Sequence, residues 1–446
     1  MKEQCISFLE KAVTAYQTIC EVKRQLTEAG YEELCETQSW KLKAGGRYFV
    51  VRGDSSLIAF QMPKEKEAKG YRIVCAHSDS PCFKIKENPV MQTEQHYVKL
   101  NVEKYGGMIA ESWFDRPLSI AGRIVVCDHA GKEGALFSIP VDLKKPLLII
   151  PSLAIHMRRD IKEQPINPQL HLLPLAGMCA DGEKPDLLQY LADAVNEERG
   201  AEDAMGNAGK TDQKIRKEDI LGMDLYVYAC DKPVIMGFSE EFLGAPRLDD
   251  LLCVYCGLSA MLQTKAEDMI PVLGIFDNEE VGSKTLQGAD SDFLRSILSR
   301  ISDASGDLTT LAERHERMRA ESFLLSADNA HALHPNYTDK ADPTNKPVLN
   351  GGIVLKYHAG QKYTTSGYSG AWVKRLCLQE EIPFQTYHNR SDIAGGSTLG
   401  NIATSHISMP AADVGLPQLA MHSAFETAGV RDIADMCRLM EAFYRA

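Results

Sequence analysis

The stretch Tyr71–Asp79 (YRIVCAHSD) decides the fold class of this chain. Its first six residues form a nearly continuous apolar run, which is typical of a strand buried on both faces in the centre of an α/β sheet. The run ends in His77-Ser78-Asp79, and α/β proteins place their reactive groups at the carboxyl edge of such sheets. The stretch therefore predicts an α/β fold with a polar site at one edge of its sheet.

Two apolar runs further along the chain end in the same way. Ile270–Phe276 leads into Asp277–Glu280 (DNEE), and Phe323–Ala327 leads into Asp328. Amphipathic helical periodicity follows or precedes these runs, most clearly in the last helix, Val430–Tyr444. Together they predict a mainly parallel sheet sandwiched between helices.

The N-terminal part of the chain predicts a helix followed by a hairpin. Apolar residues recur every three or four positions over the first thirty residues, and Gly30 fits a helix stop, so we expect one helix there. Arg47–Arg52 and Leu57–Phe60 flank a Gly53-Asp54 turn, which indicates two antiparallel strands.

The middle of the chain differs from both ends. Short strand-like runs such as Tyr97–Val102 and Leu225–Tyr228 dominate it, and Asn196–Lys217 has almost nothing to bury, which predicts a long solvated loop. We therefore expect a catalytic domain formed by residues 1–90 and 234–446. A smaller β-rich domain, residues 91–233, would be inserted between these two segments.

The composition narrows the classes of protein to consider. The chain has 446 residues, 44% of them hydrophobic, with a formal net charge of -12. It contains no apolar run long enough to cross a bilayer and no signal peptide, so we expect a cytoplasmic protein with free thiols. Its acidity argues against nucleic acid as a partner. The lone Cys253-x-x-Cys256 pair is interpreted as structural.

Five short polar segments could carry chemistry, and three of them directly follow strand-like runs. They contain His77 and Asp79, Asp249 and Asp250, Glu279 and Glu280, Asp328 and His331, and His422. Two histidines and three carboxylates form a mixed ligand set suited to Zn²⁺, Co²⁺ or Mn²⁺, provided that one carboxylate bridges two ions. The adjacent glutamates would then allow one to bind metal while the other acts as a base. The alternative interpretation is a set of helix caps and surface acids.

Six longer motifs closely resemble the aspartyl aminopeptidase family of two-metal zinc aminopeptidases. They are His77–Pro81, Trp113–Arg123, Arg247–Asp249, Phe276–Ser283, Ser326–Asn336 and Gln418–Ser423. Most of them are long and specific, and they occur in the family's order from about Phe8 to the C terminus. The resemblance implies a zinc exopeptidase-like fold and hydrolysis of the N-terminal residue of peptides.

The resemblance also implies a role for each matching residue. In the family pattern His77 and Asp328 bind one zinc ion, Glu280 and His422 bind the other, Asp249 bridges them, Glu279 is the general base and acid, and Asp79 orients His77. His156, from the inserted domain, is expected to reach the active site of a neighbouring subunit. Family members form homododecamers built from dimers, with contacts through that domain.

Three residues that resemble substrate-pocket positions bear on the substrate preference. Lys356, Tyr363 and His331 resemble substrate-pocket positions, and a lysine there could pair with an acidic N-terminal residue. Phe425 stands where the family commonly has arginine, and the stretch Asp392–Gly400 also departs from the family pattern. The alternatives are a related two-metal exopeptidase or deacylase with neutral or hydrophobic preference, and a non-catalytic metal-stabilised scaffold.

Overall fold

The chain folds into two compact units. The computed structural model describes residues 2–64, 67–127, 134–158, 165–179, 185–204, 214–304 and 311–446. The first unit comprises Met1–Ser80 and Lys232–Ala446, and the second comprises Pro81–Asp231. The inserted unit begins at Pro81 rather than at residue 91, because β5 (Cys82–Thr93) pairs with other strands of that unit.

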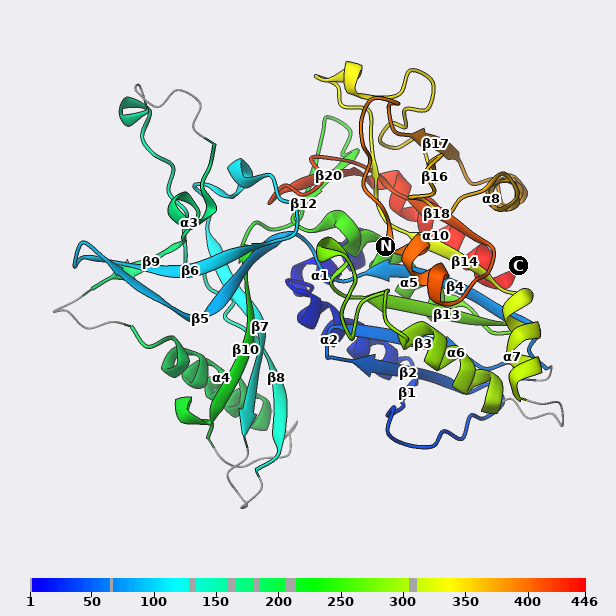
Figure 1. The fold of residues 1–446 in the computed structure, drawn as a ribbon, viewed down its shortest axis with the longest axis horizontal. Coiled ribbons are helices and arrows are strands. Elements are labelled where there is room, and N and C mark those ends of the chain that lie inside the picture. The colour runs from blue at the N-terminus through cyan, green and yellow to red at the C-terminus, as the bar shows by residue number, and fades with distance from the viewer. Residues whose placement is uncertain are drawn as a thin grey trace. The chain divides into compact units, whose positions relative to one another are not determined.

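The first unit is built on a nine-stranded sheet (Figure 1). Its strands, in spatial order, are β1 (Glu32–Glu33), β2 (Arg47–Arg52), β3 (Ser56–Gln61), β13 (Met269–Phe276), β4 (Gly70–His77), β14 (Phe323–Ala327), β18 (Ala411–Gly415), β16 (Ile353–Tyr357) and β17 (Phe384–His388). The four central strands, from β13 to β18, run parallel. The predicted α/β fold with a mainly parallel central sheet is confirmed.

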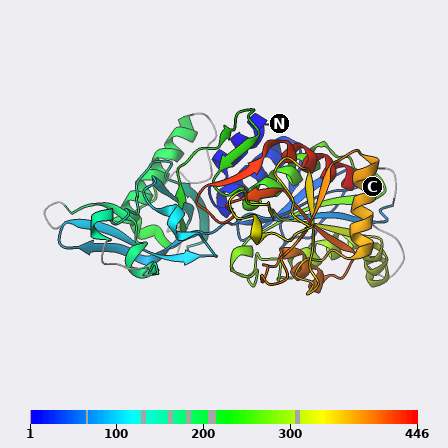
Figure 2. The same ribbon diagram turned by 90° about the horizontal axis from the view of Figure 1, so that it is seen from above.

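Helices cover both faces of this sheet (Figure 2). One face packs against α1 (Lys2–Lys11), α2 (Ala15–Glu28), α5 (Leu248–Gln263), α8 (Gly367–Gln379) and α10 (Val430–Arg445), and the other packs against α6 (Phe293–Ala304), α7 (Leu311–Ala320) and α9 (Leu399–His406). In β4, Val74 and Ala76 face the first core, whereas Ile73 and Cys75 face the second. This two-sided burial explains why the strand has no polar alternation in its sequence.

The N-terminal segment forms two helices, so the prediction of a single helix is wrong. α1 ends at Lys11 and α2 begins at Ala15, with Thr14 between them in extended conformation (φ -144°, ψ 173°). Thr14 is a β-branched residue that favours the position before a helix, and its carbonyl accepts the Thr18 N–H at 2.9 Å. The apolar periodicity continues across the break because both helices pack on the same core.

A small five-stranded sheet completes the first unit. It consists of β11 (Val234–Met236), β12 (Phe242–Ala245), β20 (Glu426–Gly429), β19 (Pro417–Leu419) and β15 (Ala330–His331). The hairpin between β19 and β20 presents the segment that contains His422. None of the helices in the described part of the chain is long and apolar enough to span a membrane.

The second unit is a six-stranded antiparallel sheet with one long helix and several short ones. Its strands, in spatial order, are β8 (Leu136–Asp142), β7 (Leu118–Cys127), β10 (Ile220–Ala229), β5, β6 (Tyr97–Tyr105) and β9 (Leu175–Met178). Its helices are α3 (Pro168–His171) and α4 (Leu187–Ala204), with 3-10 helices at Ala110–Trp113, Ile155–Met157 and Lys217–Asp219.

Helix α4 corrects the prediction of a loop over Asn196–Lys217. The helix is anchored by buried Leu191, Ala192 and Val195 and continues through residue 204, since Glu, Arg and Ala favour helix without needing burial. The Asn196 amide group donates to the Ile215 carbonyl at 2.8 Å and accepts its N–H at 2.9 Å, which ties the two ends of the segment together. Residues 205–213 lie outside the described part of the chain.

Candidate metal centre

Three parallel strands carry the candidate ligands to one edge of the large sheet. β4 ends at His77, β13 ends next to it at Phe276, and β14 ends just before Asp328. The turn after β13 places Asn278 in the left-handed region (φ 62°) and begins a 3-10 helix, Glu279–Val281. Because parallel strands end at a common edge, residues far apart in sequence meet there.

Two further segments complete the centre. Asp249 is the second residue of α5, and Arg247, just before the helix, is in left-handed conformation (φ 60°). His422 lies in the β19–β20 hairpin, with φ 68°. Positive φ is unfavourable for residues other than glycine, so the surrounding structure holds both segments in place.

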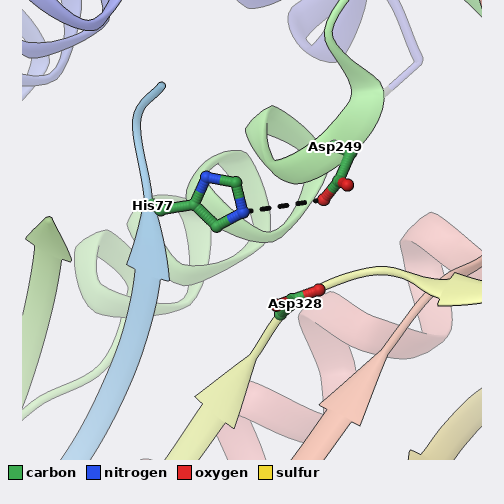
Figure 3. A group of neighbouring side chains, drawn as sticks. All are labelled: His77, Asp249 and Asp328. Carbon is green, nitrogen blue, oxygen red and sulfur yellow. Dashed lines mark ion pairs between the residues drawn. The ribbon is translucent and has the colours of Figure 1, made fainter. Parts of the chain in front are cut away.

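The structure brings five of the predicted ligands together in two overlapping groups. His77, Asp249 and Asp328 form one group, and Asp249, Glu280 and His422 form the other, with ligand atoms inside each group no more than 4.8 Å apart. A third group joins His77 with Glu279 and Glu280. Figure 3 shows the first group, with the His77 ring and the two carboxylates converging from β4, α5 and the end of β14.

Asp249 belongs to both of the first two groups, and its two oxygens face different histidines. Oδ1 lies 3.7 Å from Nε2 of His77, and Oδ2 lies 3.5 Å from Nε2 of His422. The same His422 nitrogen lies 3.3 Å from Oε1 of Glu280. A carboxylate placed in this way can bridge two cations.

The donor set fits divalent metal. Asp249 Oδ1 and Glu280 Oε1 are buried, and no hydrogen-bond donor from the described residues reaches them. Burying such oxygens costs free energy unless a donor or a cation satisfies them. Imidazole nitrogens mixed with carboxylate oxygens are a zinc-type ligand set rather than a calcium-type one.

The pKa shifts follow from this crowding of acids. Burial first, and then the neighbouring Asp328, Asp79 and Asp249, raise the pKa of Glu279 to about 8 against the lowering effect of His77. Burial and Asp249 raise the pKa of Glu280 well above its ordinary value. The pKa of Asp249 is lowered instead, because the nearby imidazoles of His422 and His77 outweigh the effect of its burial.

Asp79 contacts three members of the centre. Its Oδ1 lies 3.4 Å from Nδ1 of His77, as expected for a group that orients the imidazole. Its two oxygens also accept the backbone N–H groups of Glu279 and Glu280, each at 3.1 Å. Asp79 therefore fixes the glutamate pair as well as the histidine, which the sequence did not indicate.

Two buried acids in the centre have backbone contacts that the sequence analysis did not predict. Glu426 accepts the backbone N–H groups of Asp249 and His422, and Asp250 accepts the His77 N–H at 3.3 Å. Glu426 lies three residues after the Met421-His422-Ser423 segment, and this proximity is the only sequence feature that connects it with the centre. Hydrogen bonds to backbone groups of distant segments leave no spacing pattern to detect.

Lys356 does not point to an open pocket. It is buried in β16, and its Nζ donates to Oδ1 of Asp328 at 3.1 Å and to the Asn329 carbonyl at 3.2 Å. Tyr363 is also buried, with its ring centroid 5.3 Å from the Lys356 Nζ. Lys356 therefore contacts the candidate ligand Asp328 directly, and Tyr363 contacts Lys356.

His331 lines a cleft of about 320 Å³. Tyr387, Ile393 and Ala420 also line it, so the cleft borders the segments that lead to Asp328 and His422. The departing stretch Asp392–Gly400 contributes four consecutive residues, 393–396, to its wall.

The remaining two residues singled out in the sequence lie elsewhere. The ring of Phe425 occupies the space that a side chain at Gly244 of β12 would need, so it packs on the small sheet. His156 lies in the 3-10 helix Ile155–Met157 of the second unit, and it is exposed.

Comparison with known proteins identifies the family. The family model described as aminopeptidase I zinc metalloprotease (M18) matches residues 8–444. A probable M18 family aminopeptidase 2 of Clostridium acetobutylicum is 42% identical, covering 99% of this chain and 98% of its own. One of Stutzerimonas stutzeri is 37% identical, covering 100% and 98%.

Solved structures agree with this match. Ape4, in a cryo-electron microscopy structure of its complex with Nbr1, superimposes with a TM-score of 0.89 at 31% identity, over 99% of this chain and 85% of that one. A dodecamer of mApe1 from S. cerevisiae superimposes with a TM-score of 0.82 at 25% identity, over 99% and 96%. The chain therefore belongs to the M18 family of zinc metalloproteases and is an aminopeptidase, a hydrolase of peptide bonds.

Proposed function

We propose that this aminopeptidase holds two zinc ions, with Co²⁺ or Mn²⁺ as possible substitutes. His77 and Asp328 would hold one ion, Glu280 and His422 the other, and Asp249 would bridge them. The observation that carries this proposal is the placement of the two Asp249 oxygens, each facing a different imidazole. The donorless oxygens of Asp249 and Glu280 support it.

Glu279 is the proposed general base and acid. When bound, zinc supplies Lewis-acid charge that polarises the scissile carbonyl group. Glu279 takes a proton from the attacking water and returns it to the leaving amine. It is suited to this role because it adjoins His77 and Glu280, and because Asp79 fixes its backbone.

The same acids favour a substrate with a free amino terminus. An α-ammonium group is attracted to a centre rich in buried carboxylates, whereas an acetylated amine carries no charge to be recognised. This preference would make the enzyme an exopeptidase.

The cleft beside the centre favours an acidic N-terminal residue. Lys340, Lys346 and Arg390 line it, against one acid, Asp342. Lys356 is buried in its pair with Asp328, whereas Arg390 and Lys340 are more exposed, and exposed ion pairs such as Arg390–Asp392 are weak. We therefore assign the acidic preference to the cleft cations with His331, and we propose that Lys356 and Tyr363 support the substrate pocket indirectly.

We further propose that the chain assembles as a homododecamer built from dimers. The structurally similar S. cerevisiae mApe1 forms a dodecamer. The exposed position of His156 in the inserted unit is compatible with a contact to a neighbouring subunit, where it would help to stabilise the tetrahedral oxyanion.

A turnover panel tests the function. Purified protein with Zn²⁺, Co²⁺ or Mn²⁺ is given peptides that differ only in their N-terminal residue, each with a free or an acetylated amine. We expect metal-dependent cleavage of the free-amine peptides alone, and faster cleavage after Asp or Glu than after Leu. Preference for Leu would contradict the acidic cleft, and cleavage of acetylated peptides would indicate a deacylase or a different exopeptidase. No cleavage by a zinc-loaded protein would indicate a scaffold.

A further inference from the structure

Glu426 connects two candidate ligands that lie far apart in the sequence. It is the first residue of β20, and only 2% of its surface is exposed. Its Oε2 accepts the backbone N–H of Asp249 at 3.0 Å, and its Oε1 accepts the backbone N–H of His422 at 2.6 Å. One side chain therefore fixes the backbone of the shared ligand and of a ligand to the second ion.

The His422 backbone needs such a partner. His422 has φ 68° and Ala420 has φ 56°, so the hairpin passes twice through the left-handed region at residues other than glycine. Conformations of this kind persist only where surrounding contacts hold them. A charge-assisted hydrogen bond from the His422 N–H to a buried carboxylate is a strong contact of the required kind.

Glu426 has a counterpart on the other side of the centre. Asp79 holds the backbone N–H groups of Glu279 and Glu280 with its two oxygens, just as Glu426 holds those of Asp249 and His422. Each of the two carboxylates thus spans a pair of site residues. Groups that orient metal ligands in this way tune the affinity for the metal.

We propose that Glu426 is a positioning residue of the metal centre. Its carboxylate keeps Asp249 and His422 at the separation that zinc requires, without contacting the metal itself. This inference rests on the proposed two-zinc centre and adds to it a residue that sets the zinc affinity.

Glu426→Gln tests the proposal with little change of shape. An amide side chain offers one acceptor oxygen and one NH₂ donor, so it cannot accept from two N–H groups at once. Either Asp249 or His422 then loses its backbone partner. Glu426→Asp is measured beside it, because the shorter side chain keeps the charge but cannot span both N–H groups, and it provides an answer if the glutamine variant does not fold.

Asp432→Asn is the matched control. Asp432 is a fully buried carboxylate in the same unit, and it also accepts two backbone N–H groups, from Asn350 at 2.6 Å and Gly352 at 2.9 Å. Neither of these residues is a candidate ligand. The control therefore reproduces the loss of a doubly bonded buried carboxylate without touching the backbone of Asp249 or His422.

The measurement is zinc affinity of the full-length, metal-free proteins by competition with a chromophoric chelator, together with the thermal unfolding of each metal-free protein. We expect the Glu426 variants to bind at least one zinc ion about 10–100-fold more weakly than the wild type. Asp432→Asn should bind zinc as the wild type does, even where its thermal stability falls by a similar amount.

Two results would overturn the proposal: wild-type zinc affinity in Glu426→Gln, or an equal loss of affinity in Asp432→Asn. Failure of the underlying centre would look different, since the wild-type protein itself would then bind fewer than two zinc ions.

Discussion

Asp224 of the second unit and two acids of the candidate metal centre, Asp249 and Glu280, have different ionic partners. In the second unit, Asp224 forms ion pairs with Nζ of Lys84 at 2.8 Å and with Nε of Arg123 at 2.9 Å. These cations hold the pKa of Asp224 below its ordinary value despite its burial. In the first unit, the ion pairs of Asp249 and Glu280 that the described residues provide are with histidines alone.

This difference distinguishes acids that stabilise the fold from acids that can bind metal. An acid that serves only the fold is matched by cations or by N–H donors from the chain, as Asp224 and Asp432 are, because burying it alone is costly. Among the described residues, Asp249 and Glu280 have no lysine or arginine partner, and each has a buried oxygen without a hydrogen-bond donor, so both are suited to cations from outside the chain. The contrast separates a structural network from a metal centre without reference to any relative.

Removal of the shared ligand Asp249 should have the largest effect on the metal centre. Asp249→Ala takes away an oxygen from each of the two groups, so we expect loss of zinc from both positions and of turnover. The fall in zinc affinity should exceed the roughly 10–100-fold typical of residues that only orient ligands. Zinc content by elemental analysis and peptide turnover check this. A variant that keeps two zinc ions would show that Asp249 is not shared.

The thermal stability of the zinc-free protein should depend on pH, because the acids of the centre then lack their metal. The pKa of Glu279 and of Glu426 is raised to about 8 from 4.5, chiefly by burial, so the folded state holds more protons than the unfolded state between these values. Stability should therefore fall as the pH rises through this window, by a few degrees in melting temperature. Zinc should offset the fall by neutralising the acids.

Thermal unfolding at pH 5, 6.5 and 8, with and without zinc, provides the check. Greater stability of the zinc-free protein at pH 8 than at pH 5 would contradict this account of the first unit.

The smallest effect is expected in the second unit. Asp224→Asn should lower the free energy of unfolding by about 1 kcal/mol, as for a partly exposed ion-pair network. Because the pKa of Asp224 is depressed, its contribution is present above the ordinary value of 3.8 and is lost as the pH falls below it. Denaturant unfolding at neutral and acidic pH checks this. Zinc content should not change, and a loss of zinc would contradict the separation of the two networks.

The sequence predicted the parts of the fold that depend on local pattern. Apolar runs such as Tyr71–Ala76 identified buried strands, because burial on both faces removes polar alternation. The break at Thr14 was missed, since both helices bury the same face. Helix α4 was missed beyond Asn196, since a helix can extend from a buried first half with little left to bury.

The residues of the candidate site also differ in whether the sequence could predict them. Ligand-type residues that follow strands could be listed from the sequence, and His77, Asp249, Glu280, Asp328 and His422 do converge. Partners that act through the backbone could not, because the hydrogen bond between Glu426 and Asp249 joins residues 177 positions apart. The pairing of Lys356 with Asp328 was equally hidden, since a lysine at a strand end is more often solvated.

Glu279→Gln tests the central claim most directly. The claim is that the acids of the centre divide into metal ligands and one base. We expect the purified variant to contain two zinc ions per chain, as the wild type should, while its turnover of a free-amine peptide falls about 10²–10⁴-fold. Wild-type turnover by the zinc-loaded variant would contradict the account.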